Sequence, residues 1–272
     1  MAKAQKKNQG RDTLKQKGFL GRIPNVVWLL ISFTAALLLL FFISSTESGG
    51  IVIASPIKVV EKLIQKTEDG TLWPHIGISL FRVLAGFACG FGLALPIAFL
   101  MGWYAPFRHL VEPWIQFVRN IPPLAYIPLV IVGAGVGEQA KVVVIFIATF
   151  LVLVVTIYQG VCNVDTTLIK AARVLGAKDR DIFFRVVIPA STPFIFTGAR
   201  LGLSSALTTL VAAELTGASK GLGMMIQKAS GYYDMATVLL GIILIGIIGM
   251  SLEKLVKFLE RRLTGWQETI VR

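Results

Sequence analysis

The chain has 272 residues, of which 55% are hydrophobic and only 15% are charged. This composition is too apolar for an ordinary soluble domain and predicts an integral membrane protein. The formal net charge of +12 would suit a nucleic-acid-binding protein, but the positions of the charges, described below, argue against that class.

Apolar runs long enough to form membrane-spanning helices occupy most of the chain. A helix needs roughly 20 apolar residues to cross a bilayer. Six runs are near or above this length: residues 26–43, 76–102, 110–132, 142–161, 193–213 and 235–252. We therefore expect an all-α protein with a six-helix membrane domain at residues 24–258, a basic segment at 1–23 and a tail at 259–272. The first run could also be a signal peptide, but its length and the lack of a small-x-small cleavage site favour an uncleaved span.

Lys and Arg are distributed unequally between the two predicted sides of the membrane. An even number of spans places both termini on the same side. That side carries eighteen Lys and Arg residues: seven before the first run, five within residues 165–189, five after the last run, and Arg108. The opposite side carries six. The excess predicts that both termini and residues 165–189 are cytoplasmic, where these cations contact lipid headgroups rather than nucleic acid.

The segment between the first two runs predicts a short amphipathic helix that starts at Ser55-Pro56. We expect this helix to lie along the outer membrane surface, to pack on the bundle, or to act only as a spacer. Its apolar stripe consists of Ile57, Val60, Leu63 and Ile64.

The third run, VEPWIQFVRNIPPLAYIPLVIVGAGVG, is interrupted by four prolines. Proline disrupts a helix, and a membrane tolerates the freed backbone groups only where protein or a water-filled cavity satisfies them. We therefore expect the run to face the protein interior. One hypothesis is that Arg119, Asn120, Pro122 and Pro123 line the translocation pathway or form a gate. The alternative is that Arg119 holds the broken backbone carbonyls together.

Two further arginines fall within the runs, where charge is expensive and usually faces a partner or a cavity. We expect Arg82 to form a structural ion pair with Glu214, with a gating or solute-facing role as the alternative. Arg200 lies close enough to the cytoplasmic end to extend its guanidinium to the surface. Glycine pairs at 86/90 and 198/202 permit close helix contact, either within one subunit or between two.

Residues 165–189 form a charged island between two apolar runs. Asp165 or Thr166 can cap a first helix, and Gly176 can end it in the left-handed conformation. We expect a second helix from Asp179 to Pro189. The next span is then expected to begin at Thr192-Pro193.

The first of these two helices has a narrow apolar face with helical spacing, which consists of Leu168, Ala171, Ala172 and Leu175. Such a face suits docking into a groove on another protein. A helix lying on the membrane surface is the alternative, because the five nearby cations would favour it too.

The spacing of Ala171-Ala172, Gly176, Val186 and Ile188-Pro189 resembles the EAA loop of binding-protein-dependent ABC importer permeases. Those permeases carry Glu, Ile and Leu where this chain has Lys170, Val186 and Ile188. The last two replacements keep shape and polarity. Lys170 inverts a charge, so the salt bridge that the family's Glu would make is not implied here. The stretches SPIKVVEKL, RNIPPLAYIPLVIV, TLVAAELTGASKGLG and RRLTGW resemble the nitrate, sulfonate and taurine branch of this family.

The resemblance implies the type I importer fold, with two copies of the chain around one pore in the bacterial inner membrane. It further implies that the island is the coupling helix, seated on a separate ATPase subunit. The residues it assigns to this coupling are Leu168, Lys170, Ala171, Ala172, Leu175, Gly176, Val186, Ile188 and Pro189. Two ATPase subunits would bind the ATP and Mg, and an external solute-binding protein would deliver the solute.

Neither a phosphate-binding loop of the G-x-x-x-x-G-K-[ST] type nor a metal-ligand cluster is found in the sequence. We therefore expect a non-catalytic permease without a metal or cofactor of its own, for a small anionic solute such as taurine, a sulfonate or nitrate. The alternative is an ion-coupled carrier or channel that works without an ATPase. Such a protein would show paired acidic residues in mid-span or inverted repeats, and neither is apparent.

Overall fold

The structure is a computed structural model that describes residues 25–45 and 54–264. These residues form helices joined by turns, and no β-strand occurs among them. The predicted segment 1–23 lies outside the described residues, as do residues 265–272 of the predicted tail. The chain divides into two compact units, residues 1–60 and 61–272.

The first unit contains α2 (Asn25–Ser44), a helix of 20 residues over the first predicted run. At 1.5 Å per residue its length is about 30 Å, the thickness of the hydrocarbon layer. α4 (Pro56–Glu68) begins at the predicted Pro56 and extends into the second unit. The predicted apolar stripe of α4 is exposed in this chain.

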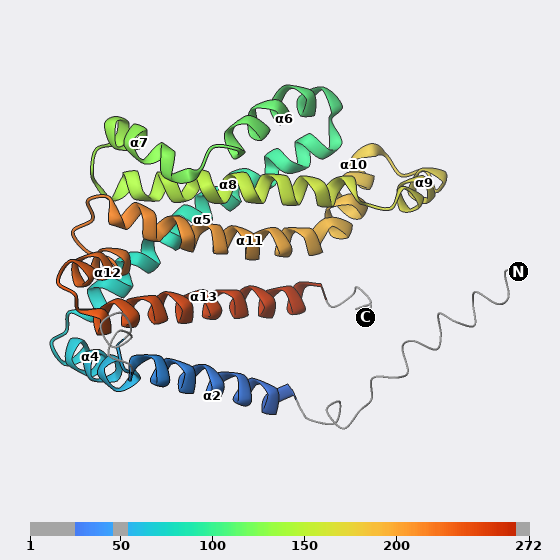
Figure 1. The fold of residues 1–272 in the computed structure, drawn as a ribbon. Helices are drawn as coiled ribbons and strands as arrows, with labels where there is room; N and C mark the ends of the chain where they lie inside the picture. The colour runs from blue at the N-terminus through green and yellow to red at the C-terminus, as the bar shows by residue number, and fades with distance from the viewer. Residues whose placement is uncertain (1–24, 46–53, 265–272) are drawn as a thin grey trace, which may run out of the picture. The chain divides into compact units, whose positions relative to one another are not determined.

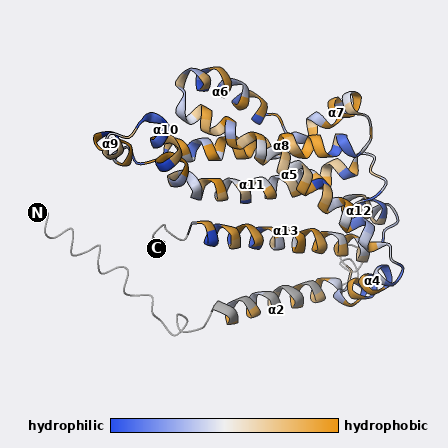
Figure 2. Ribbon diagram, turned by 180° about the vertical axis from the view of Figure 1, so that it is seen from behind, coloured by the Kyte–Doolittle hydropathy of each residue, from blue (hydrophilic) through white to orange (hydrophobic). Residues whose placement is uncertain are grey.

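The second unit is built on four long apolar helices: α5 (Leu72–Trp103), α8 (Glu138–Cys162), α11 (Ile188–Leu215) and α13 (Met235–Leu263). Among the described residues these four helices are long and apolar enough to cross a membrane, α11 being counted together with the short helices before it. Figure 1 shows them side by side, and Figure 2 shows that hydrophilic residues gather near their ends. The prediction of an all-α membrane protein is confirmed.

The core of the second unit lies where α8 packs between α5 and α11. Leu153, Val154 and Ile157 of α8 are completely buried, together with Ala94 and Ala98 of α5. Lipid supplies no hydrophobic force between helices, so helix association in a membrane depends on close packing. Small residues permit this packing because they let the helix backbones approach each other. A Cβ atom at position 90 would lie 3.2 Å from the Cβ of Thr149, and one at position 202 would lie 3.0 Å from Cγ of Leu153. The glycine pairs therefore serve packing within one subunit.

The third predicted run is not one continuous helix. It folds as α6 (Ala105–Arg119), the 3₁₀ helix η2 (Pro123–Tyr126) and α7 (Ile127–Ala134), with a bend of 94°. If the bent pair counts as one span, the described residues contain five candidate spans. The predicted disruption at the prolines is confirmed, and the bent pair is long and apolar enough together to serve as the one predicted crossing. We refer to α6, η2 and α7 as the α6–α7 hairpin.

Side chains near the bend donate hydrogen bonds to backbone carbonyls in the last turn of α6. Asn120 Nδ2 donates to the Gln116 carbonyl at 2.9 Å, and the Tyr126 hydroxyl donates to the Val118 carbonyl at 2.9 Å. Such compensation is required for irregular backbone at membrane depth.

The island folds as α9 (Thr166–Val174), α10 (Asp179–Ile182) and the π-helix η3 (Phe183–Val187), which continues into α11. The predicted helix start at Thr192-Pro193 is therefore wrong. Thr192 lies inside α11, and its hydroxyl donates to the Ile188 carbonyl at 3.2 Å. α11 continues through Pro193, which is an internal proline of this helix.

A short helix that the sequence analysis did not predict, α12 (Leu222–Gly231), lies between α11 and α13. It lies at the end of the long helices opposite α9, as Figure 1 shows. Leu222 and Met225 pack with Leu72 at the start of α5, so α12 is part of the folded unit rather than a loose connection.

Candidate functional site

Both ends of α9 are closed by specific backbone contacts. Asp165 accepts a hydrogen bond from the Thr167 backbone N–H at 2.7 Å, so Asp165 rather than Thr166 is the N-cap. This bond, with help from the Thr167 hydroxyl, lowers the pKa of the Asp165 carboxyl. At the other end Gly176 has φ of +81°. Its N–H donates to the Arg173 carbonyl and the Ala177 N–H to that of Ala172, which is a Schellman motif.

The outer surface of α9 is apolar and strongly exposed. Val174 and Leu175 are 87% and 86% exposed, and Leu168 is 50% exposed. Ala171 and Lys170 are exposed as well. We refer to Leu168, Ala171, Val174 and Leu175 as the α9 tip. Val174 was not among the residues predicted for this face, and Ala172, which was, packs against the protein core instead.

The remaining residues of the EAA-like pattern attach the α9 tip to the membrane helices. Val186 and Ile188 are half-buried against the core, and Val187 between them is 1% exposed. Pro189 lies in the first turn of α11. From Asp179 to Leu215 the helical segments are continuous over 37 residues. α10, η3 and α11 therefore form one continuous helical segment, and the turn at residues 175–178 connects α9 to its start.

The hairpin of α6 and α7 presents its polar break and large apolar side chains outward. Arg119, Asn120 and Pro122 are exposed, and Pro123 is half-buried. Nearby, Trp114, Phe117 and Leu124 are 68%, 64% and 56% exposed. In the described part of the chain no hydrogen bond from the Arg119 guanidinium to a backbone carbonyl is found, and the side chains that bond carbonyls at the break are Asn120 and Tyr126.

A buried cluster of charged residues joins α5, α8 and α11. The Arg82 guanidinium is completely buried and binds Glu138 through two hydrogen bonds, of 2.6 and 2.7 Å. Its Nη1 donates to Glu214 Oε1 at 2.6 Å and to the Lys220 carbonyl at 2.8 Å. The Ser79 hydroxyl also donates to Glu214, at 2.7 Å. The structure thus brings the predicted pair of Arg82 and Glu214 together and adds Glu138, which the sequence analysis missed.

The same cluster fixes the turn between α11 and α12. The Gly223 N–H donates to Glu214 Oε2 at 2.7 Å, and the Leu222 N–H donates to the Ser79 hydroxyl at 2.9 Å. Gly221 has φ of +138°, and a Cβ atom there would collide with the Glu214 carboxylate. Only glycine suits a position with this conformation and so little space.

The candidate residues do not form one site. The Arg82 cluster includes Glu138 at the start of α8 and Glu214 at the end of α11. Figure 1 shows α9 at the other end of these two helices. Arg200 forms a separate ion pair with Glu260 at 2.8 Å, instead of only extending to the membrane surface. Among residues 25–45 and 54–264, no group of three or more His, Cys, Asp or Glu side chains is placed to hold a metal ion.

Comparison with known proteins identifies the family. The family model described as "Binding-protein-dependent transport system inner membrane component" matches residues 90–265. A probable ABC transporter permease of Brucella abortus is 52% identical over 82% of this chain and 89% of its own length. The taurine transport system permease TauC of Escherichia coli is 38% identical over 78% of each chain. The nitrate import permease NrtB of Synechocystis is 28% identical over 87% of this chain and 89% of its own length.

The fold is also found among solved structures. An inward-facing form of the MetNI methionine ABC transporter aligns with a TM-score of 0.63 at 21% identity, covering 72% of this chain and 98% of that chain. An amino acid ABC transporter aligns with a TM-score of 0.57 at 20% identity, covering 74% and 97%. The chain therefore belongs to the binding-protein-dependent transport family, as a non-catalytic, membrane-embedded permease subunit of a type I ABC importer in the nitrate, sulfonate and taurine branch.

Proposed function

We propose that two copies of this chain form the pore of an importer for a small anionic solute, and that the α9 tip couples the pore to two ATPase subunits. The ATPase subunits bind the ATP and Mg, and this chain needs no cofactor. A solute-binding protein delivers the solute on the far side of the bacterial inner membrane. Both termini, and α9 with them, face the cytoplasm.

The observation that carries the coupling role is the exposure of the α9 tip. Two adjacent large apolar side chains, Val174 and Leu175, are almost fully exposed on a helix whose two ends are closed by defined caps. A rigid helix with an uncovered apolar tip suits the cleft of a protein partner. Inward movement of the tip would pull α11, and with it the helices packed on α11.

The exposed residues of the α6–α7 hairpin support the proposal that a second copy of the chain is present. Arg119 is exposed in this chain, and an arginine facing lipid at membrane depth is unfavourable. The large apolar side chains around it would also gain dispersion contacts against another protein surface. We infer that the second copy covers the hairpin, and that Arg119 and Asn120 with Pro122 and Pro123 line the solute route between the copies, where a cation favours an anion.

Two observations support an anionic solute: the names of the related permeases and the positive charge of Arg119. The related permeases are named for taurine, aliphatic sulfonates and nitrate, all of which carry an oxyanion group at neutral pH. An exposed guanidinium in the route would attract such groups. The external delivery protein then sets which of these solutes is imported.

The coupling role is tested by Leu175→Glu in the complete transporter. The substitution places a charge where the ATPase cleft would close over an apolar side chain, so we expect loss of ATPase co-purification and of uptake. Leu175 is 86% exposed, so the subunit itself should keep its expression and thermal stability. Leu263→Glu is the matched control, because Leu263 is a 53% exposed leucine at the end of α13.

Normal co-purification and uptake by Leu175→Glu would refute the coupling role. Uptake that continues after complete removal of the ATPase would favour an ion-coupled carrier or channel instead.

A further inference from the structure

A cavity of about 240 Å³ lies at the end of the long helices opposite α9. Its wall is formed by α4, α5, α12, the turn after α12 and the start of α13: Lys66, His75, Met224, Met225, Lys228, Ala229, Tyr232, Asp234 and Thr237. A water molecule occupies ~30 Å³ of liquid, so the cavity has the volume of about eight waters. It therefore has room for a small organic molecule, though not for a large one.

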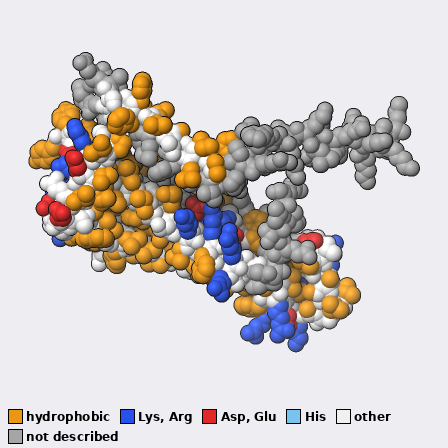
Figure 3. All heavy atoms as spheres, turned by 90° about the horizontal axis from the view of Figure 1, so that it is seen from below, with side chains coloured by type: hydrophobic (Ala, Val, Ile, Leu, Met, Phe, Trp, Pro, Cys, Tyr) orange, Lys and Arg blue, Asp and Glu red, His pale blue; other side chains and the backbone are white. Residues whose placement is uncertain are grey.

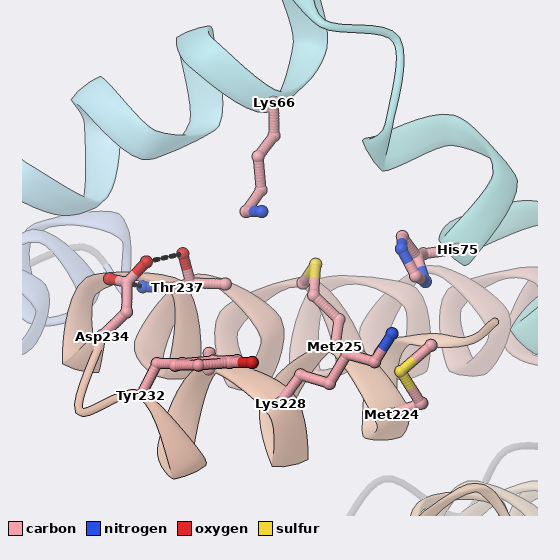
Figure 4. A pocket seen from close by; sticks show the side chains of 9 residues that line it. Lys66, His75, Met224, Met225, Lys228, Tyr232, Asp234 and Thr237 are labelled. Carbon is pink, nitrogen blue, oxygen red and sulfur yellow. Dashed lines mark hydrogen bonds between the residues drawn. The ribbon is translucent and has the colours of Figure 1, made fainter. Parts of the chain in front are cut away.

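The wall carries uncompensated positive charge. Lys66 is half-buried and Lys228 is exposed, and no ion pair of either lysine is found in the part of the chain that the structure describes. Figure 4 shows both side chains reaching into the space that His75 and Met225 also face.

The carboxylate in the wall, Asp234, already has hydrogen-bond and ion-pair partners within the protein. Asp234 accepts hydrogen bonds from the Thr237 N–H at 3.1 Å and the Thr237 hydroxyl at 2.8 Å, and Lys62 lies 3.7 Å away. Burial alone would raise the pKa of Asp234, but the Thr237 bonds and the charges of Lys62 and Lys66 lower it. Lys62 is the ion-pair partner of Asp234, whereas Lys66 acts on Asp234 only at longer range, so the ammonium groups of Lys66 and Lys228 are available to a ligand.

Short contacts to the backbone hold the His75 side of the wall. His75 Nδ1 lies 2.9 Å from the Gly221 carbonyl oxygen and 3.0 Å from the Gly221 nitrogen, in the turn that the Arg82 cluster holds. Met224 and Met225 are each 5% exposed and give the cavity an apolar floor. Tyr232, which is 85% exposed at the rim, adds a hydroxyl donor.

We propose that this cavity binds a small oxyanion: a sulfonate, sulfate, carboxylate or phosphate group with at most a short apolar stem. Lys66 and Lys228 hold the oxygens, the Tyr232 hydroxyl donates to them, and the two methionines contact the stem. The site is separate from the α9 tip and from Arg119. It therefore goes beyond the proposed function and does not depend on ATPase coupling.

The experiment uses the full-length chain in phosphatidylcholine nanodiscs, with inorganic sulfate as the probe at constant ionic strength. We expect saturable binding by calorimetry, weakened about tenfold for each lysine changed to glutamine, because a hydrogen bond to a charged group contributes about one decade of affinity. The variant is Lys66→Gln/Lys228→Gln. The matched control is Lys220→Gln/Lys254→Gln, which removes the same charge from two exposed lysines outside the cavity and should bind like the wild type.

A second pair of nanodiscs containing phosphatidylglycerol distinguishes a lipid phosphate from a free anion. If the lipid is the source, the wild type retains more phosphatidylglycerol than the double variant in native mass spectrometry, and the lipid displaces sulfate. Lys66→Arg/Lys228→Arg should restore binding, because the role is ionic. Equal sulfate binding and equal lipid retention by the wild type and the Gln double variant would overturn the proposal.

Discussion

Replacing Arg82 by methionine should destabilise the second unit more than any other single loss of an ion pair in the described chain. Arg82 and Glu214 are both 0% exposed, and the substitution leaves the Glu214 carboxylate buried without its cation. Removing one partner of a buried ion pair costs about 3–5 kcal/mol of folding free energy. Ser79 and the Gly223 N–H still donate to Glu214, but neither supplies charge.

Two matched variants set the scale for this loss. Arg200→Met breaks an Arg–Glu pair of similar length, 2.8 Å, whose side chains are 29% and 23% exposed. Glu138→Gln removes a partner that is 44% exposed. Pairs that solvent can reach contribute about 1 kcal/mol or less, so each of these variants should lose about that amount.

The assay is reversible unfolding of the purified chain in mixed micelles by a denaturing detergent, followed by tryptophan fluorescence. The expected order of stability loss is Arg82→Met well above Arg200→Met and Glu138→Gln. Equal losses for Arg82→Met and Arg200→Met would show that burial of the Arg82 cluster does not control its energetics, and the reasoning would fail.

Two further outcomes follow from backbone geometry and capping. Gly221→Ala should lose about 1–3 kcal/mol in the same assay, because its φ of +138° is strained for alanine and its Cβ displaces Glu214; Gly231→Ala, which meets open space, should change stability little. The Asp165 cap has a lowered pKa, so its stabilisation of α9 is present above the unfolded pKa, near 4, and is lost as the pH falls through the folded value. Hydrogen exchange of the α9 amides should show this loss at low pH in the wild type but not in Asp165→Asn, and a pH response in both would contradict the capping role.

The long helices could be predicted because their signal is local. A run of some 20 apolar residues has one interpretation in a membrane protein, and α5, α8, α11 and α13 all follow predicted runs. The caps of α9 were equally readable, since Asp165 and Gly176 are residue types that favour those positions. Prediction failed where local rules compete: Thr192-Pro193 has the residue types of a helix start, but α11 begins at Ile188 and continues through Pro193.

The role of Glu138 could not be read locally, because it depends on contacts between distant segments. Glu138 stands at the start of a span, where an acidic residue usually needs no explanation. One signal was available: a buried guanidinium has five N–H donors, and Glu214 alone cannot satisfy them all. A second acid at the same end of the bundle could have been sought on that ground. α12 was missed because ten residues with mixed polarity give too weak a pattern.

The Arg82 cluster also constrains how the chain is made. Arg82 leaves the ribosome before either partner, because Glu138 follows by 56 residues and Glu214 by 132. At roughly 5–20 residues per second, the second carboxylate arrives roughly 7–26 s after the arginine. The complete cluster can therefore form only after the last residues of α11 have been synthesised.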